Sequence, residues 1–237
     1  MGYVLSQGAC MLSYPKVLNE WQTVAELREG RSIARYGDGE LKLCLGRHAC
    51  AQKANRNLQN ALTDILRTSN KELIVGIPRI AAPNDAIMSQ QKREFWMEYR
   101  KPEYTRMYDA NRVYGSSFIT RPDSANEIDS SEYFDTVRSI WEDRDVVLIN
   151  GDNKRFDKRS SILSNAKSSE RWEAPSQHAW DEYDNLVEAA FKKPQDTIFI
   201  LCIGPTATVL AHQLCTAGYQ ALDLGHFGMF YAHYREE

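Results

Sequence analysis

Short apolar runs alternate with longer stretches of helical periodicity along most of the chain. Two of the runs, VVLIN and TIFILCI, are almost wholly apolar, which is typical of central strands that are covered on both faces. We predict strands over residues 32–36, 73–77, 117–120, 146–150, 197–203 and 220–224. We predict helices over residues 17–28, 58–68, 90–107, 132–141, 177–191 and 206–217.

This alternation predicts an α/β fold, a Rossmann-like, mainly parallel sheet flanked by helices. No repeat and no Pro/Gly/Ser-rich linker divides the 237 residues, so we expect a single domain over residues 1–237. Ligands of such sheets bind at the carboxyl ends of the strands. The residues that follow each predicted strand are therefore the first candidates for a site.

Composition narrows the classes of function. A formal net charge of -3 argues against a non-specific nucleic-acid binder, which would carry a basic excess. No apolar run is long enough for a transmembrane helix, and the first residues lack the pattern of a signal peptide. The five cysteines include no CxxC pair, which favours free thiols in a reducing compartment. We therefore expect a cytoplasmic location.

The segment GDGE follows the first predicted strand directly. Gly37 allows a sharp turn there, and the carboxylates of Asp38 and Glu40 can converge on one point. Two such oxygen ligands suit Mg²⁺ or Mn²⁺, which also bind substrate phosphates. The alternative is structural: Asp38 forms an Asx-type turn and Glu40 caps the next helix. Arg35, at the end of the strand, can pair with these acids or contact a phosphate.

A second candidate follows the late apolar strand. Gly204, Pro205 and Thr206 lead from the strand into a predicted helix, and proline suits the first helical turn. The free N–H groups and the dipole of a helix N-terminus attract phosphate. The segment matches neither a Walker A loop nor a GxGxxG fingerprint, so a purely structural turn is the alternative.

Other polar residues also follow predicted strands. Arg121 is a candidate ligand for a diphosphate, with a surface arginine as the alternative. Gly151 and Asp152 follow VVLIN, and Asp152 can serve either as a catalytic base or as a turn residue. His226 follows the last strand and can contact a metal or a phosphate, or be a histidine that only packs in a turn.

Taken in order, several blocks resemble the GT-D type of glycosyltransferase, a bacterial family first described as a domain of unknown function. The blocks are SIARYGDGE, YGSSFITRP, IWEDRDVVLINGDNKRF, ILCIGPTATVLAHQL and GYQALDLGH. Each block alone is weakly specific, but their order spans nearly the whole chain.

The resemblance implies a Rossmann-like domain that transfers a hexose, typically glucose, from a UDP-sugar to a glycan acceptor in surface polysaccharide or glycoprotein synthesis. It implies a DxE motif at Asp38 and Glu40 that holds Mn²⁺ or Mg²⁺. It also implies peripheral membrane contact where the acceptor is linked to a lipid rather than to a protein. It places Arg35, Arg121, Gly204, Pro205, Thr206 and His226 at matching motif positions, and with Gly37 and Gly151 these are our predicted donor-binding residues.

The chain departs from the family pattern in two places. Gly228 and Phe230 stand where the family usually has carboxylates, and DKRSSILSN replaces a Gly-rich stretch. The missing carboxylates leave open a non-catalytic nucleotide-sugar-binding subunit of a glycosylation complex. A second alternative is another Rossmann-type transferase, such as a methyltransferase.

Overall fold

The computed structural model describes residues 14–49, 51–80, 89–151 and 161–235. Its strands run parallel in one eight-stranded sheet, in the order β1-β4-β3-β2-β8-β7-β5-β6. The predicted α/β class with a parallel sheet is therefore confirmed. The strands are β1 (Lys16–Val17), β2 (Ser32–Arg35), β3 (Leu73–Ile77), β4 (Val113–Ser116), β5 (Asp145–Gly151), β6 (Ser168–Ala174), β7 (Ile198–Cys202) and β8 (Gln220–Asp223).

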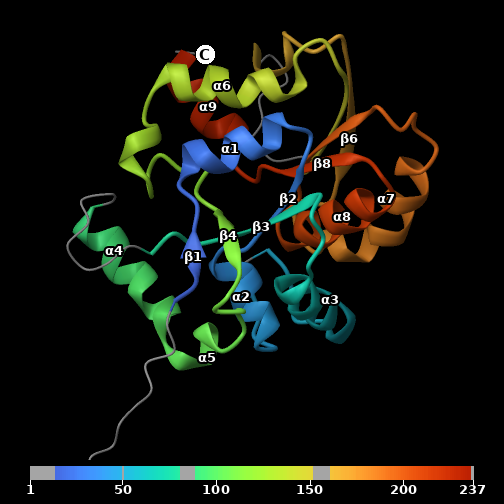
Figure 1. The fold of residues 1–237 in the computed structure, drawn as a ribbon. Helices are drawn as coiled ribbons and strands as arrows, with labels where there is room; N and C mark the ends of the chain where they lie inside the picture. Colours follow the sequence, from blue (N-terminus) through green and yellow to red (C-terminus); the bar gives the residue numbers. More distant parts are fainter. Residues whose placement is uncertain (1–13, 50, 81–88, 152–160, 236–237) are drawn as a thin grey trace, which may run out of the picture.

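Helices cover both faces of this sheet (Figure 1). Helices α1, α6 and α9 lie together on one face, whereas α2, α3 and α8 lie on the other, where α8 packs against β2 and β8. The helices are α1 (Glu20–Arg28), α2 (Asp38–Cys44), α3 (Arg56–Arg67), α4 (Gln90–Met97), α5 (Pro102–Thr105), α6 (Ser131–Arg138), α7 (Tyr183–Ala190), α8 (Pro205–Thr216) and α9 (Phe227–Arg235). Short 3-10 helices span Glu98–Arg100, Asn126–Ile128, Ser139–Trp141, Ser161–Leu163 and Ala179–Glu182.

Local sequence signals explain several element boundaries. Asn19 caps α1 by accepting the backbone N–H of Gln22 at 2.7 Å, so the helix begins after it rather than at residue 17. The helix predicted over residues 90–107 is divided into α4, a 3-10 turn and α5. Pro102 begins α5 because proline lacks the N–H that a continuous helix needs.

The strand predicted over residues 117–120 is wrong. Strand β4 lies just before it and ends at Ser116, and the following residues form a turn. Phe118 and Ile119 are apolar because this turn is buried in the core, where they are at most 2% exposed. Buried turns carry the same apolar signal as strands, so the pattern alone placed the strand too late.

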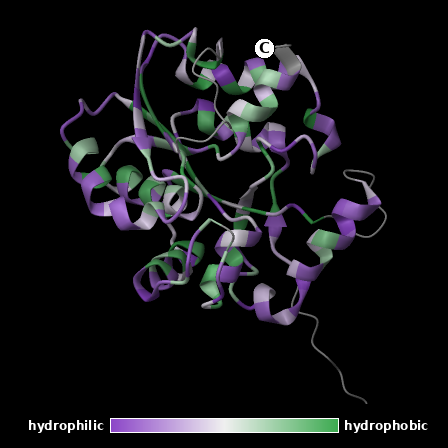
Figure 2. Ribbon diagram, turned by 180° about the vertical axis from the view of Figure 1, so that it is seen from behind, coloured by the Kyte–Doolittle hydropathy of each residue, from purple (hydrophilic) through white to green (hydrophobic). Residues whose placement is uncertain are grey.

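The hydrophobic core lies along the strands. Figure 2 shows apolar segments crossing the middle of the molecule and hydrophilic segments on the outer faces of the helices. Strands β2, β3 and β7 are formed almost wholly by buried residues, as expected for a sheet covered on both faces. None of the described helices combines the length and the apolar character that a membrane crossing requires.

Strands from opposite ends of the chain meet in the middle of the sheet. Ile33 of β2 pairs with Leu222 of β8, so β3 and β4 extend the sheet on one side while β7 and β5 extend it on the other. Open α/β sheets bind ligands at such a switch point, outside the carboxyl ends of the strands. The carboxyl ends of β2, β4, β7 and β8 therefore define the place to examine.

Candidate active site

A pocket of about 280 Å³ lies at this edge of the sheet. Segments that follow β2, β4, β7 and β8 line it, together with helix α4 and the segment after α2. Its lining residues are Arg35, Gly37, Asp38, Gly39, Glu40, Ala49, Ala51, Trp96, Ser117, Phe118, Arg121, Gly204, Pro205, Asp223, Gly225 and His226. The structure thus brings together eight of the predicted site residues: Arg35, Gly37, Asp38, Glu40, Arg121, Gly204, Pro205 and His226.

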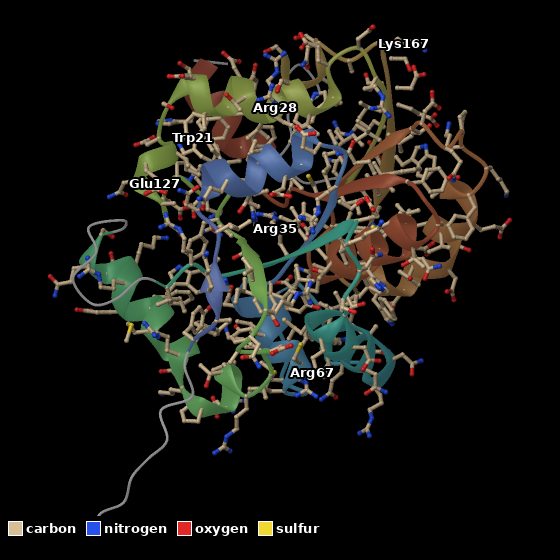
Figure 3. The ribbon with its side chains drawn as sticks, in the orientation of Figure 1. Trp21, Arg28, Arg35, Arg67, Glu127 and Lys167 are labelled. Carbon is tan, nitrogen blue, oxygen red and sulfur yellow. The ribbon has the colours of Figure 1, made fainter. Side chains whose placement is uncertain are left out.

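Arg35 and Asp223 form a buried ion pair in the wall of this pocket. Figure 3 shows Arg35 near the middle of the molecule, whereas Lys167 lies at its periphery. The guanidinium of Arg35 donates to the carbonyl oxygen of Asp223, to the carbonyl of Ser117 at 3.0 Å and to Oγ1 of Thr120 at 2.8 Å. The Arg35 side chain therefore joins the ends of β2, β4 and β8, which fixes the shape of the pocket.

Gly225 makes room for this arginine. A Cβ atom at Gly225 would collide with the guanidinium of Arg35, and the φ of 54° at this residue lies in the left-handed region. Only glycine meets both demands without strain. The position of Arg35 thus explains why residue 225, directly before His226, is a glycine.

Asp38 and Glu40 lie in the first turn of helix α2, which follows β2 directly. The backbone N–H of Gly37 donates to Oε2 of Glu40 at 2.8 Å, and the Nζ of Lys42 contacts Oδ2 of Asp38 at 2.9 Å. The capping interaction foreseen as the alternative for Glu40 is therefore present. It does not remove the carboxylates from the pocket, because both residues line it.

Negative charge is concentrated beside this helix start. Burial, together with the nearby charge of Asp223, raises the pKa of Glu40 to about 7. Burial likewise raises the pKa of Asp223, although the positive charge of Arg35 acts in the opposite direction and lowers it. Three carboxyl groups, of Asp38, Glu40 and Asp223, line one small pocket. A cation bound beside them would relieve the repulsion between the carboxylates.

Helix α8 begins at the other side of the pocket. Gly204 has a φ of 60°, and Pro205 is the first residue of the helix, as predicted. Thr206 is fully buried, does not line the pocket, and its Oγ1 has no hydrogen-bond partner in the part of the chain that the structure describes. Thr208, one turn into the helix, donates to the carbonyl of Arg35 at 2.9 Å and so ties α8 to β2.

Arg121 is held in place by an acid rather than left on the surface. Its Nε and Nη2 both contact Asp123, each at 2.8 Å, and Lys92 contacts the same carboxylate at 2.8 Å. These two cations lower the pKa of Asp123 to about 2 despite its partial burial. The guanidinium also lies over the ring of Phe230, 5.8 Å from its centroid. Arg121 therefore brings an ordered positive charge to the pocket wall.

Two predicted residues are placed elsewhere. Gly151 ends β5 and does not line the pocket; a Cβ at this position would lie 3.1 Å from Ser176. Asp152 lies outside the described residues. Among the other lining residues, the sequence reasoning did not consider Ser117 and Asp223 as candidates. Asp223 could have been found, because it is an acid in an otherwise apolar run at the end of a predicted strand.

Comparison with known proteins gives a consistent result. The chain is similar to the probable glycosyl transferase Gly of Streptococcus gordonii and to the glycosyltransferase GlyD of Streptococcus pneumoniae serotype 4 (strain ATCC BAA-334 / TIGR4). It is 28% identical to each over 210 residues, which cover 86% of this chain. The chain spans only 31% of the first relative and 26% of the second.

Solved structures agree over nearly the whole chain. One, described as a highly conserved domain of unknown function 1792 with a distinct glycosyltransferase fold, has a TM-score of 0.87 and 31% identity. That match covers 95% of this chain and 83% of the other. A new glycosyltransferase from Streptococcus sanguinis has a TM-score of 0.83 and 28% identity, over 94% of this chain and 85% of its own.

A family model matches the chain as well. The model for the glycosyltransferase GT-D fold covers residues 33–237, which include every residue that lines the pocket. Sequence, fold and family model thus agree, and the chain belongs to the family of glycosyltransferases with the GT-D fold.

Proposed function

We propose that this chain transfers a hexose from a UDP-sugar to a glycan acceptor, with a divalent cation held by Asp38 and Glu40. The observation that carries the proposal is the convergence of the start of α2, the start of α8 and the Arg35–Asp223 pair on one pocket. A nucleoside diphosphate needs such a combination of a cation, free N–H groups and ordered arginines, because it carries concentrated negative charge.

The residues present fit Mn²⁺ or Mg²⁺. Both ions take carboxylate oxygens and keep positions for waters and substrate phosphates. In the part of the chain that the structure describes, no three His, Cys, Asp or Glu side chains are grouped to hold a metal. Two protein carboxylates, Asp38 and Glu40, would therefore share the ion with the donor. When bound, the ion neutralises charge on the departing diphosphate.

The protein groups have separate tasks in this proposal. The positive end of the α8 dipole attracts the phosphates, and Gly204 lets the chain approach them closely. Arg121, ordered by Asp123, adds positive charge on the β4 side of the pocket. Arg35 keeps Asp223 and the β4 turn in position around the donor.

The acceptor side of the proposal rests on the resemblance of the sequence blocks to the family. That resemblance favours a glycan in surface polysaccharide or glycoprotein synthesis, carried on a lipid or a protein, with the reaction on the cytoplasmic side. Asp152, which follows strand β5, is our candidate for the base that an inverting reaction requires.

Substitution of Asp38 tests the proposal. Asp38→Asn should abolish the Mn²⁺-dependent part of UDP binding in isothermal titration calorimetry while the chain stays folded, because the amide carries no charge. Glu188→Gln is a matched control, since Glu188 pairs with Lys192 one helical turn away, as Asp38 does with Lys42, but outside the pocket. Equal UDP binding by wild type and Asp38→Asn, with and without Mn²⁺, would remove the metal from the proposal.

A further inference from the structure

Two residues that line the pocket each carry a buried polar atom that has no partner among the described residues. Nε1 of Trp96 and Oγ of Ser117 are buried and make no hydrogen bond with any of the residues that the structure describes. The two residues are only 4% and 6% exposed, and both line the pocket. Buried polar side chains in folded proteins are nearly always hydrogen-bonded, so an unpaired one beside a pocket points to a ligand.

The chemistry of the two groups restricts that ligand. The indole of Trp96 only donates a hydrogen bond, whereas the hydroxyl of Ser117 both donates and accepts. A sugar hydroxyl, which also does both, satisfies either group. Neither of these two side chains carries a charge. This corner of the pocket therefore suits a neutral polar group better than a phosphate.

The surroundings suit the apolar faces of a sugar ring. Phe118 packs against Trp96 with the ring centroids 5.0 Å apart, and both aromatic residues line the pocket. Ala49 and Ala51 line the same pocket with small side chains. Ligand pockets commonly combine such apolar walls with a few polar groups that fix the orientation of the ligand.

We infer that Trp96 and Ser117 bind hydroxyl groups of the donor's hexose, and so act as specificity-determining residues for the transferred sugar. The inference rests on the proposed function. It assigns the hexose rather than the acceptor because both side chains belong to the buried wall of a small pocket that also holds Asp38 and Glu40. The hexose is the part of the donor that is covalently attached to the diphosphate.

The test compares the binding of UDP-glucose with that of UDP, both with Mn²⁺, by isothermal titration calorimetry. Ser117→Ala and Trp96→Phe should each weaken UDP-glucose binding by roughly three- to tenfold, the worth of one hydrogen bond, and leave UDP binding unchanged. The unfolding midpoint of Ser117→Ala should not fall, because the hydroxyl that it removes has no partner.

Ser124→Ala is the matched control. Its hydroxyl is also buried and without a partner among the described residues, but Ser124 does not line the pocket, so both affinities should stay as in wild type. The inference is overturned if Ser117→Ala and Trp96→Phe bind UDP-glucose like wild type, or if they lose UDP and UDP-glucose affinity equally. Failure of the wild type to bind either compound would instead reject the proposed function.

Discussion

At the scale of single residues, the acids of the GDGE segment combine two roles that the sequence presented as alternatives. Glu40 caps Gly37 at the start of α2 and also lines the pocket. A carboxylate has two oxygens, so one can accept a backbone N–H while the other faces a ligand. The spacing of Asp38 and Glu40 could not distinguish a cap from a ligand, because the first turn of a helix serves both purposes.

The raised pKa of Glu40 leads to a prediction about pH. Its carboxyl has a pKa of about 7 in the folded chain against an ordinary value of 4.5, so the folded state holds the proton more tightly. The stability that this adds is fully present below pH 4.5 and is lost as the pH rises through 7. Without metal, the free energy of unfolding of the wild type should therefore fall by about 1 to 3 kcal/mol relative to that of Glu40→Gln between pH 5 and pH 8.

Urea unfolding in EDTA at the two pH values measures this difference. The comparison with Glu40→Gln matters because Glu127 also has a pKa of about 7, through burial and its contact with Glu20, and its contribution cancels between the two proteins. A difference in the free energy of unfolding between wild type and variant that stays constant from pH 5 to pH 8 would contradict the prediction.

At the scale of elements, the sequence predicted the buried, apolar strands and missed elements whose composition resembles that of loops and turns. Strands β2, β3, β5, β7 and β8 were located because their apolar runs are distinct. Strand β6 was missed because an edge strand carries Glu170 and Arg171, which resemble a loop in composition. Helix α2 was missed because it is short and begins with the residues of a turn.

The start of α8 allows a prediction about its glycine. Gly204 combines a φ of 60° with a ψ of -144°, a conformation that side chains strongly disfavour. Gly204→Ala should therefore lower the free energy of unfolding by about 1 to 3 kcal/mol, although no atom lies within 4 Å of the added Cβ. Chemical denaturation monitored by circular dichroism measures the loss.

Gly39 provides the comparison within the same pocket. It lies in the first turn of α2 with an ordinary φ, and a Cβ there would make a normal contact with Ala49 at 3.6 Å. Gly39→Ala should be neutral or stabilise the chain by up to about 1 kcal/mol, as alanine does in a helix. Equal destabilisation by both substitutions would show that the backbone conformation of Gly204 does not control stability here.

At the scale of the whole molecule, one sheet supports both the core and the candidate site. The sequence predicted the edge of the sheet at which the site lies, since that follows from parallel strands alone. It could not predict that Trp96 of α4 reaches the same pocket, because α4 lies far from the other lining residues along the chain and no local pattern marks the contact.

The same arrangement predicts how a ligand affects unfolding. The pocket joins strands from both sides of the β2–β8 junction, so donor binding should stabilise the described fold as one unit. UDP with Mn²⁺ at a hundred times its Kd should raise a single melting temperature by about 5 to 10 °C in differential scanning calorimetry. Two transitions, of which only one shifts, would contradict this expectation.

The edge strand β6 has a consequence for the behaviour of the protein in concentrated solution. β6 is the last strand in the sheet order, and its outer edge pairs with none of the described strands. A strand from another copy that added there would have to approach Glu170, Arg171 and Glu173. These charges oppose the edge-to-edge association of two sheets, so this edge resists aggregation.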